Sequence, residues 1–152
     1  MNDTLFDEKW DAICTACLER VKAVDYDITR LSQDEAEVVA LWRLVADGYN
    51  GGFLQFFCNW GENNCAIALN ALRHIGAANT LAIVQKQRNI VERLNGHPDM
   101  KEYEDVYRLL TDEEADTIYC QLDPEFWDAA KEIPILAAPI YQYLISQQIR
   151  RH

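Results

Sequence analysis

The stretch that decides the fold reads Asn50-Gly51-Gly52-Phe53-Leu54-Gln55-Phe56-Phe57-Cys58-Asn59. Its Asn-Gly-Gly triplet supplies positions that adopt positive φ at little cost, which is typical of a helix that ends and is followed at once by another. The phenylalanines then lie three and four residues apart and form one aromatic face, which we expect to enter the core. Gln55 and Asn59 fall on another face, where they can hydrogen-bond backbone groups of the loop. We predict a structural role, rather than a ligand pocket, for Asn50, Gly51, Gly52, Phe53, Gln55, Phe56, Phe57 and Asn59.

N-terminal to this stretch, apolar residues recur at steps of three and four, the period of an amphipathic helix. Asp3 or Thr4 can cap a first helix. Ser32 and Glu35 form a capping box that begins a second helix, which ends around residues 48–52. The apolar stripes of these helices are Phe6, Trp10, Ile13, Cys17, Val21 and Val24 in the first, and Val38, Trp42, Val45 and Tyr49 in the second.

C-terminal to the stretch, the same period continues. A helix over 62–75 places Cys65, Leu69 and Leu72 inward, with Gly76 at its C′ position. Another begins at Asn79 or Thr80 and ends at residues 95–96. Pro98 suits the first turn of the next helix, and Thr111 with Glu114 forms a second capping box. Helices over 124–131 and 135–148 complete the chain.

The chain has 152 residues, 49% of them hydrophobic, which excludes a disordered protein. No run alternates apolar and polar residues between hairpin turns. The sequence therefore predicts an all-α fold: one compact domain over residues 1–152, a bundle of seven to nine helices with no significant sheet.

Acidic residues are concentrated in the two outer thirds of the chain. Acids outnumber bases 25 to 14, a formal net charge of −11. The net charge is −6 over residues 1–50, +2 over 51–97 and −7 over 98–152. Such a surface repels nucleic acid and anionic membranes, so we expect no direct nucleic-acid or membrane partner. The same charge can serve solubility alone, or it can attract a basic partner.

Several acids follow one another at helical spacing. Residues four apart rise about 6 Å along a helix, comparable to the separation of successive phosphates. Helix capping accounts for part of the clustering, because acids favour first turns. It does not account for rows that run past the first turn. The predicted partner-binding surface comprises Asp99, Glu102, Glu104, Asp105, Asp112, Glu113, Asp116, Asp123, Glu125 and Asp128, followed by Asp3, Asp7 and Asp11.

Motifs for catalysis or metal binding are weak. Cys14 and Cys17 lie well inside an amphipathic helix, which favours buried core thiols over a redox pair or a zinc site. His74 and His97 occur in no metal-binding spacing, and no phosphate-binding loop or nucleophile elbow is present. We expect no enzyme activity, metal or cofactor. An enzyme with a carboxylate site in a helical cleft is the alternative, which a perturbed carboxylate pair in a deep pocket would favour.

The first residues lack the basic and apolar regions of a signal peptide, and the five cysteines fit a reducing compartment. The longest apolar run, residues 133–141, contains two prolines and is far shorter than the roughly 20 residues of a membrane span. We therefore expect a cytoplasmic protein.

The central motif also resembles a known family. Leu41-Trp42, residues 50–53, residues 55–59, Ala68, Leu72 and residues 75–77 are similar to a family of small acidic bacterial proteins whose named member is a dimeric DNA mimic. The similarity covers roughly residues 41–82. It implies an all-helical domain that can pair into a homodimer. The matching residues are apolar and turn-forming, whereas mimicry depends on acids elsewhere in the chain.

Acidity and resemblance together favour a non-enzymatic acidic binding protein, a DNA mimic. Its expected partner is a basic DNA-binding protein, for example a helix-turn-helix transcription regulator, whose DNA-binding surface it would occupy. The alternative is an immunity-type neutraliser of a basic toxin or nuclease, because acidic inhibitors of nucleases use the same electrostatics.

Overall fold

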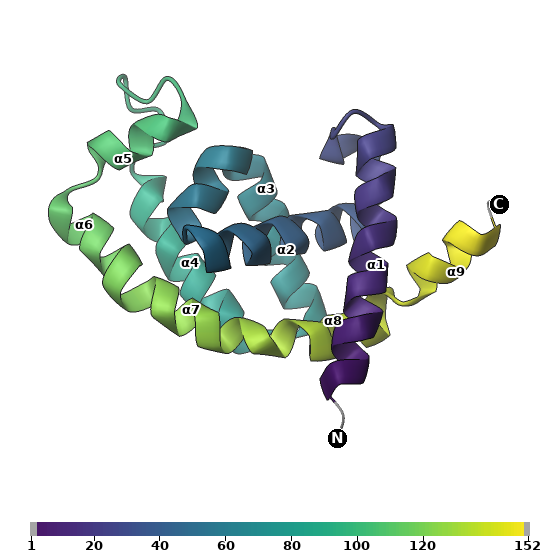
Figure 1. Ribbon diagram of the computed structural model, residues 1–152. Coiled ribbons are helices and arrows are strands. Elements are labelled where there is room, and N and C mark those ends of the chain that lie inside the picture. The colour runs from purple at the N-terminus through teal and green to yellow at the C-terminus, as the bar shows by residue number, and fades with distance from the viewer. Residues whose placement is uncertain (1–2, 151–152) are drawn as a thin grey trace.

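The computed structural model describes the backbone of residues 3–150 and the side chains of residues 5–146. Within these residues it contains helices and no strand, which confirms the predicted all-α fold. Figure 1 shows the arrangement. The α-helices are α1 (Asp3–Ala23), α2 (Gln33–Asn50), α3 (Phe53–Ile75), α4 (Ala78–Glu92), α5 (Val106–Leu109), α6 (Asp112–Asp116), α7 (Asp123–Ala129), α8 (Ile133–Tyr141) and α9 (Tyr143–Arg150). Short helical turns are η1 (Ile28–Arg30), η2 (Tyr103–Asp105), η3 (Thr117–Leu122, a π-helical turn) and η4 (Ala130–Glu132).

The pair α2 and α3 forms the centre of the molecule, and Gly52 makes the connection between them. Gly52 has φ +85°, where an L side chain is strained, and α3 begins at the next residue. Phe53, Phe56 and Phe57 are all buried, which confirms the predicted aromatic insertion into the core. Phe53 and Phe57 stack with ring centroids 6.0 Å apart. The motif thus fixes both the turn and the packing that follows it.

Gly61 divides α3 into two helical segments. Its φ of +80° interrupts the helix, so the segments are 53–60 and 62–75, of which the sequence predicts the second as a helix. A β-carbon at this position would lie 2.5 Å from the ring of Tyr103, which packs across the break. Cys65, Leu69 and Leu72 of the second segment are buried, and Gly76 ends it in the left-handed conformation.

The prediction that Gln55 and Asn59 bond backbone groups of the loop is wrong: both bond side chains instead. Asp47 of α2 accepts hydrogen bonds from Gln55 Nε2 at 2.9 Å, Asn59 Nδ2 at 3.2 Å and Trp60 Nε1 at 2.9 Å. Asn50 donates to the other end of the Gln55 amide. Because Asp47 lies one turn before the end of α2, this network ties α3 to the helix that precedes it.

Both predicted capping boxes are present. The Ser32 hydroxyl accepts from the Glu35 amide at the start of α2, and that of Thr111 accepts from the Glu114 amide at the start of α6. The predicted helical turn at Pro98 is wrong: residues 98–102 are not helical, and the chain becomes helical only at η2. The Asp105 carboxylate accepts from the Lys101 and Glu102 amides and begins the helix there.

An outer arc of helices, from α6 through η3, α7 and η4 to α8, borders the lower edge of the molecule in Figure 1. Its inner face carries Ile118, Leu122 and Phe126, all buried. Trp127 Nε1 donates to the Gly48 carbonyl, and the Tyr49 hydroxyl donates to the Trp127 carbonyl, both at 2.8 Å. These reciprocal bonds join the arc to α2.

The cysteines are free thiols, mostly in the core. Cys14, Cys17 and Cys65 are buried, Cys58 is half-buried and Cys120 is exposed. Burial raises the pKa of the Cys17 thiol to about 12 and that of Cys65 to about 12. The pair Cys14 and Cys17 is therefore part of the packing of α1, as its position in an amphipathic stripe predicts.

Candidate acidic interface

Most of the predicted acidic residues are exposed and carry no ion pair. The segment from residue 99 to the end of α7 presents them on the loop before η2, on η2 itself, on α6 and on α7, outside the buried stripe of the arc. Among the described residues, none of them forms a salt bridge, so their charges reach solvent undiminished. They are Asp99, Glu102, Glu104, Asp112, Glu113, Asp116 and Glu125 in this segment, with Asp7 and Asp11 on α1.

Two predicted residues are partly neutralised. Asp105 accepts two backbone amides and lies 3.4 Å from an Arg108 nitrogen. The hydrogen bonds from the Glu102 and Lys101 amides lower the pKa of Asp105. Asp128 lies 3.3 Å from Lys131 Nζ, with both side chains largely exposed, so that this pair contributes little to stability. Glu114, which the sequence assigned to capping, additionally pairs with Arg93.

Asp123 corrects the sequence prediction: it is buried, with 3% of its surface exposed, and cannot contact a partner. Its Oδ1 accepts from the Phe53 amide at 3.1 Å and from Gln87 Nε2 at 2.7 Å. Burial raises the pKa of the Asp123 carboxyl, although these two hydrogen bonds act in the opposite direction. Asp123 is thus an internal tether between α7 and the start of α3.

A groove connects the acids of α1 with the far end of the arc. It has a volume of about 500 Å³ and lies between α1, α2 and the η4–α8 junction. Asp7 and Asp11 line one side and Lys131 the other, with Trp10, Trp42 and Tyr49 in its wall. Figure 1 shows the N-terminal half of α1 crossing α8 at this place. The Asp3 side chain, predicted to belong to the same row, lies outside the described residues.

Exposed aromatic side chains accompany the acids, and their exposure was not expected from the sequence. Trp42 and Tyr49 share the apolar stripe of α2, yet they are 39% and 47% exposed. Tyr107, Tyr119 and Trp127 are similarly exposed on the acidic segment itself. Helical spacing identifies a stripe, but only the packing of the arc decides which of its members stay at the surface. Tyrosine and tryptophan are enriched in protein interfaces.

This acidic and aromatic outer surface can attract and hold a cationic one. Carboxylates without local counterions create a negative field that steers a basic partner, and amphipathic rings supply contact area once the partner has docked. We define the acidic face as the exposed acids at 99–128, together with Asp7 and Asp11. Within the described residues, no helix is both long and apolar enough to cross a lipid bilayer.

The fold and this face define an all-helical protein with an acidic outer surface. The chain belongs to the DMP19-like protein family, whose model matches residues 29–152. All of α1, which carries two acids of the acidic face, precedes the matched region. No curated protein and no solved structure matches the chain.

Proposed function

We propose that this protein is a non-enzymatic DNA mimic, which occupies the basic DNA-binding surface of a regulator and thereby excludes DNA. The observation that supports this most is the run of exposed, unpaired carboxylates on α6 and α7 and on the loop before η2. The resemblance of residues 41–82 to the family of a dimeric DNA mimic agrees with this role, and so does the possibility that two copies pair. We place the protein in the cytoplasm, where such regulators act.

The spacing of the acids suits a surface that binds DNA phosphates. Asp112 and Asp116 are four residues apart, about 6 Å along the axis of a helix, which approximates successive phosphates of one strand. Glu125 and Asp128 extend the row along α7. A side chain of arginine or lysine that reaches a phosphate in the DNA complex would meet a carboxylate oxygen here, with similar charge-assisted hydrogen bonds.

Lysine and arginine are scarce where the partner would dock. Between residues 98 and 130 only Lys101 and Arg108 are basic, and Arg108 is held beside Asp105. A basic partner would therefore encounter little repulsion over this segment. The association would be fast at low ionic strength and would weaken as salt screens the exposed charges.

A competition experiment tests the proposal. Helix-turn-helix regulators from the same cell are bound to their operators, and this protein is added in a gel-shift titration at low salt. We expect release of DNA from at least one regulator by the wild type, and an apparent affinity about tenfold weaker for the double variant D112N/D116N. The matched control E19Q/D25N removes two negative charges outside the acidic face and keeps wild-type affinity.

Two results would contradict this function. If no regulator releases its operator at low salt, the protein is not a DNA mimic. If both double variants weaken competition equally, the effect follows from net charge and not from the arrangement of carboxylates on α6. Inhibition of a nuclease encoded beside this protein, with no effect on any regulator, would instead indicate the immunity-type neutraliser.

A further inference from the structure

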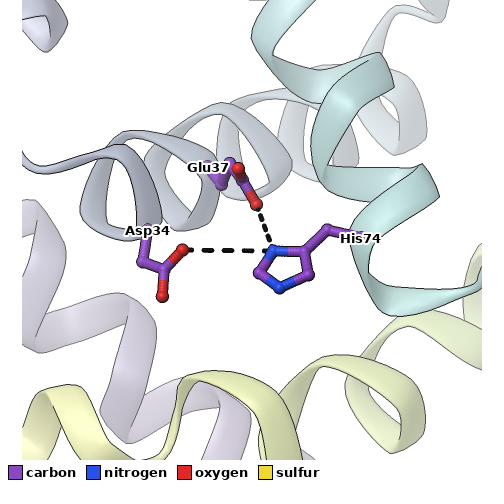
Figure 2. Close-up of side chains that lie close together, drawn as sticks. All are labelled: Asp34, Glu37 and His74. Carbon is purple, nitrogen blue, oxygen red and sulfur yellow. Dashed lines mark hydrogen bonds and ion pairs between the residues drawn. The ribbon is translucent and has the colours of Figure 1, made fainter.

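Three side chains outside the acidic face converge near the start of α2. Asp34 and Glu37 are three residues apart and therefore share one face of the helix. His74, near the end of α3, points between them, as Figure 2 shows. Its Nδ1 lies 2.8 Å from Glu37 Oε1 and 4.0 Å from Asp34 Oδ1. One nitrogen and two carboxylate oxygens thus lie within 4.8 Å of one another.

The charge at this cluster lacks a permanent counterion. The Glu37 side chain is 2% exposed, and within the described residues its only ion pair is with His74. Asp34 likewise has no lysine or arginine partner among those residues. Buried carboxylates are normally paired with a basic group or bound to a metal ion. Here a single imidazole faces two carboxylates, so a bound cation would neutralise negative charge that the imidazole alone does not.

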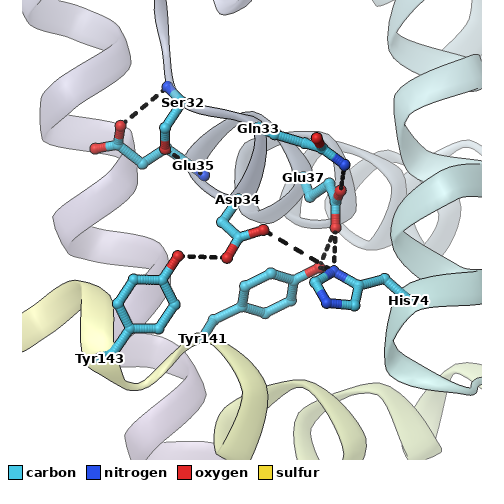
Figure 3. Close-up of polar contacts among 8 residues, drawn as sticks. All are labelled: Ser32, Gln33, Asp34, Glu35, Glu37, His74, Tyr141 and Tyr143. Carbon is cyan, nitrogen blue, oxygen red and sulfur yellow. Dashed lines mark hydrogen bonds and ion pairs between the residues drawn. The ribbon is translucent and has the colours of Figure 1, made fainter.

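Outer hydrogen bonds hold both carboxylates in place, as Figure 3 shows. The Tyr143 hydroxyl donates to Asp34 Oδ2, and Gln33 Nε2 donates to Glu37 Oε2 at 3.1 Å. These bonds occupy the oxygens that face away from the imidazole. The Tyr141 hydroxyl donates to Glu37 Oε1 at 2.6 Å, which leaves that oxygen a further lone pair. Such outer donors are what orients carboxylate ligands in metal sites.

We propose that Asp34 Oδ1, Glu37 Oε1 and His74 Nδ1 bind one divalent transition-metal ion, with Zn²⁺ as the representative. An imidazole nitrogen combined with carboxylates favours Zn²⁺ and its neighbours, because Mg²⁺ and Ca²⁺ prefer oxygen ligands alone. The His74 side chain is 42% exposed, so water has access to complete the coordination. The ion lies between α2 and α3 and fastens the end of one helix to the start of the other.

Binding at Nδ1 sets the tautomer of the imidazole. Without a metal, the Nδ1 proton can be donated to Glu37 Oε1; with a metal, the Nδ1 lone pair binds the ion and the proton resides on Nε2. Nε2 is the ring nitrogen that points away from both carboxylates in Figure 2. Metal binding at Nδ1 therefore requires that nitrogen to be free of its proton, and a proton that it carries beforehand moves to Nε2 or to solvent.

The test uses the full chain, stripped with a chelator and titrated with Zn²⁺ by isothermal calorimetry. We expect one ion per chain and a thermal midpoint that rises with Zn²⁺ concentration, since the folded state alone assembles the site. H74Q should weaken Zn²⁺ binding at least tenfold. H97Q is the matched control, because within the described residues the His97 side chain has a hydrogen bond only with the nearby Asp99 amide. This variant should bind Zn²⁺ as the wild type does.

D34N provides a second variant. It replaces one carboxylate ligand by an amide at Asp34, a half-buried residue in the first turn of α2. It should also weaken Zn²⁺ binding at least tenfold, while far-UV circular dichroism of both variants remains that of the wild type. Wild-type protein that takes up no Zn²⁺ would overturn the site. Equal binding by H74Q and H97Q would place the ion elsewhere and also overturn it, as would Mg²⁺ binding as tight as that of Zn²⁺. None of these results depends on DNA mimicry.

Discussion

The carboxylate of Asp123 occupies the space that a side chain at Gly52 would need. A β-carbon on Gly52 would lie 2.8 Å from Asp123 Cγ and closer still to Oδ2. The same carboxylate accepts the amide of Phe53, the first residue of α3. A glycine in the central motif and an acid 71 positions later therefore form a single structural unit. Because Gly52 has no side chain, the Asp123 carboxylate can pack against its backbone.

Replacing Gly52 by valine should unfold the protein before it affects any partner. The positive φ costs a non-glycine residue about 1–3 kcal/mol, and displacement of Asp123 adds to that, so we expect a loss of at least about 3 kcal/mol. Urea denaturation measures it. Gly96 is the control, because it also has positive φ but no atom within 4 Å of its β-carbon position. G96A should cost only the backbone strain; a G52V loss no larger than that would show that Asp123 yields freely.

Two substitutions at Asp123 should separate the contribution of its hydrogen-bond acceptor to stability from that of its charge. D123A leaves the Phe53 amide and the Gln87 amide group without their acceptor, which costs about 1–3 kcal/mol for a buried donor. D123N keeps an oxygen that accepts from both donors. It also removes a buried negative charge, whose unfavourable burial is what raises the pKa of Asp123, so this variant should cost less than about 1 kcal/mol. Equal losses for the two variants in thermal unfolding would mean that the negative charge is required.

Glu114 predicts how stability depends on acid. Hydrogen bonds from Arg93 and from the Thr111 cap lower the pKa of Glu114 from 4.5 to about 2. A depressed pKa stabilises the folded state above the unfolded value, and this contribution disappears as the pH falls from about 4.5 towards 2. E114Q should thus be destabilised by about 1 kcal/mol at pH 7, and the difference from wild type should shrink across that window. A difference that stays constant between pH 7 and pH 3 would contradict the assignment.

Thiol reactivity should separate the five cysteines. Cys120 is exposed, whereas Cys14, Cys17 and Cys65 are buried in the core. Cys58 is half-buried, and its burial raises the pKa of the thiol to about 11. A thiol reagent at mildly alkaline pH should label one site rapidly in the native protein, and all of them in concentrated guanidinium. C120S should abolish the rapid phase, and C58S should retain it. Rapid loss of more than one thiol would show that the core opens readily.

Local signals in the sequence were sufficient for much of the fold. The boxes at Ser32 and Thr111 and the end of α3 at Gly76 depend on residues within one or two turns, so they were predicted correctly. Pro98 permits a first helical turn but does not enforce one, and the Asp105 carboxylate begins the helix later instead.

Features that depend on distant contacts could not be predicted. Asp123 and Asp128 look alike in sequence, yet one lies against Gly52 and the other in solvent, because α7 turns only one face towards α3. Trp42 stays exposed because it lines surface grooves beside α1 and is not covered by another element. His74 and Glu37 are 37 positions apart, and nothing in their spacing indicates that the α2–α3 pairing brings them together.

Asp123 also gives the acidic face a link to the interior. It belongs to the same helical arc as Glu125 and Asp128, but its carboxylate holds the first amide of α3. We therefore expect that a protein bound to the outside of the arc would change the strength of the hydrogen bond between Asp123 and the Phe53 amide. The rate of hydrogen exchange at the buried Phe53 amide should therefore report the binding of a partner at the surface of the arc.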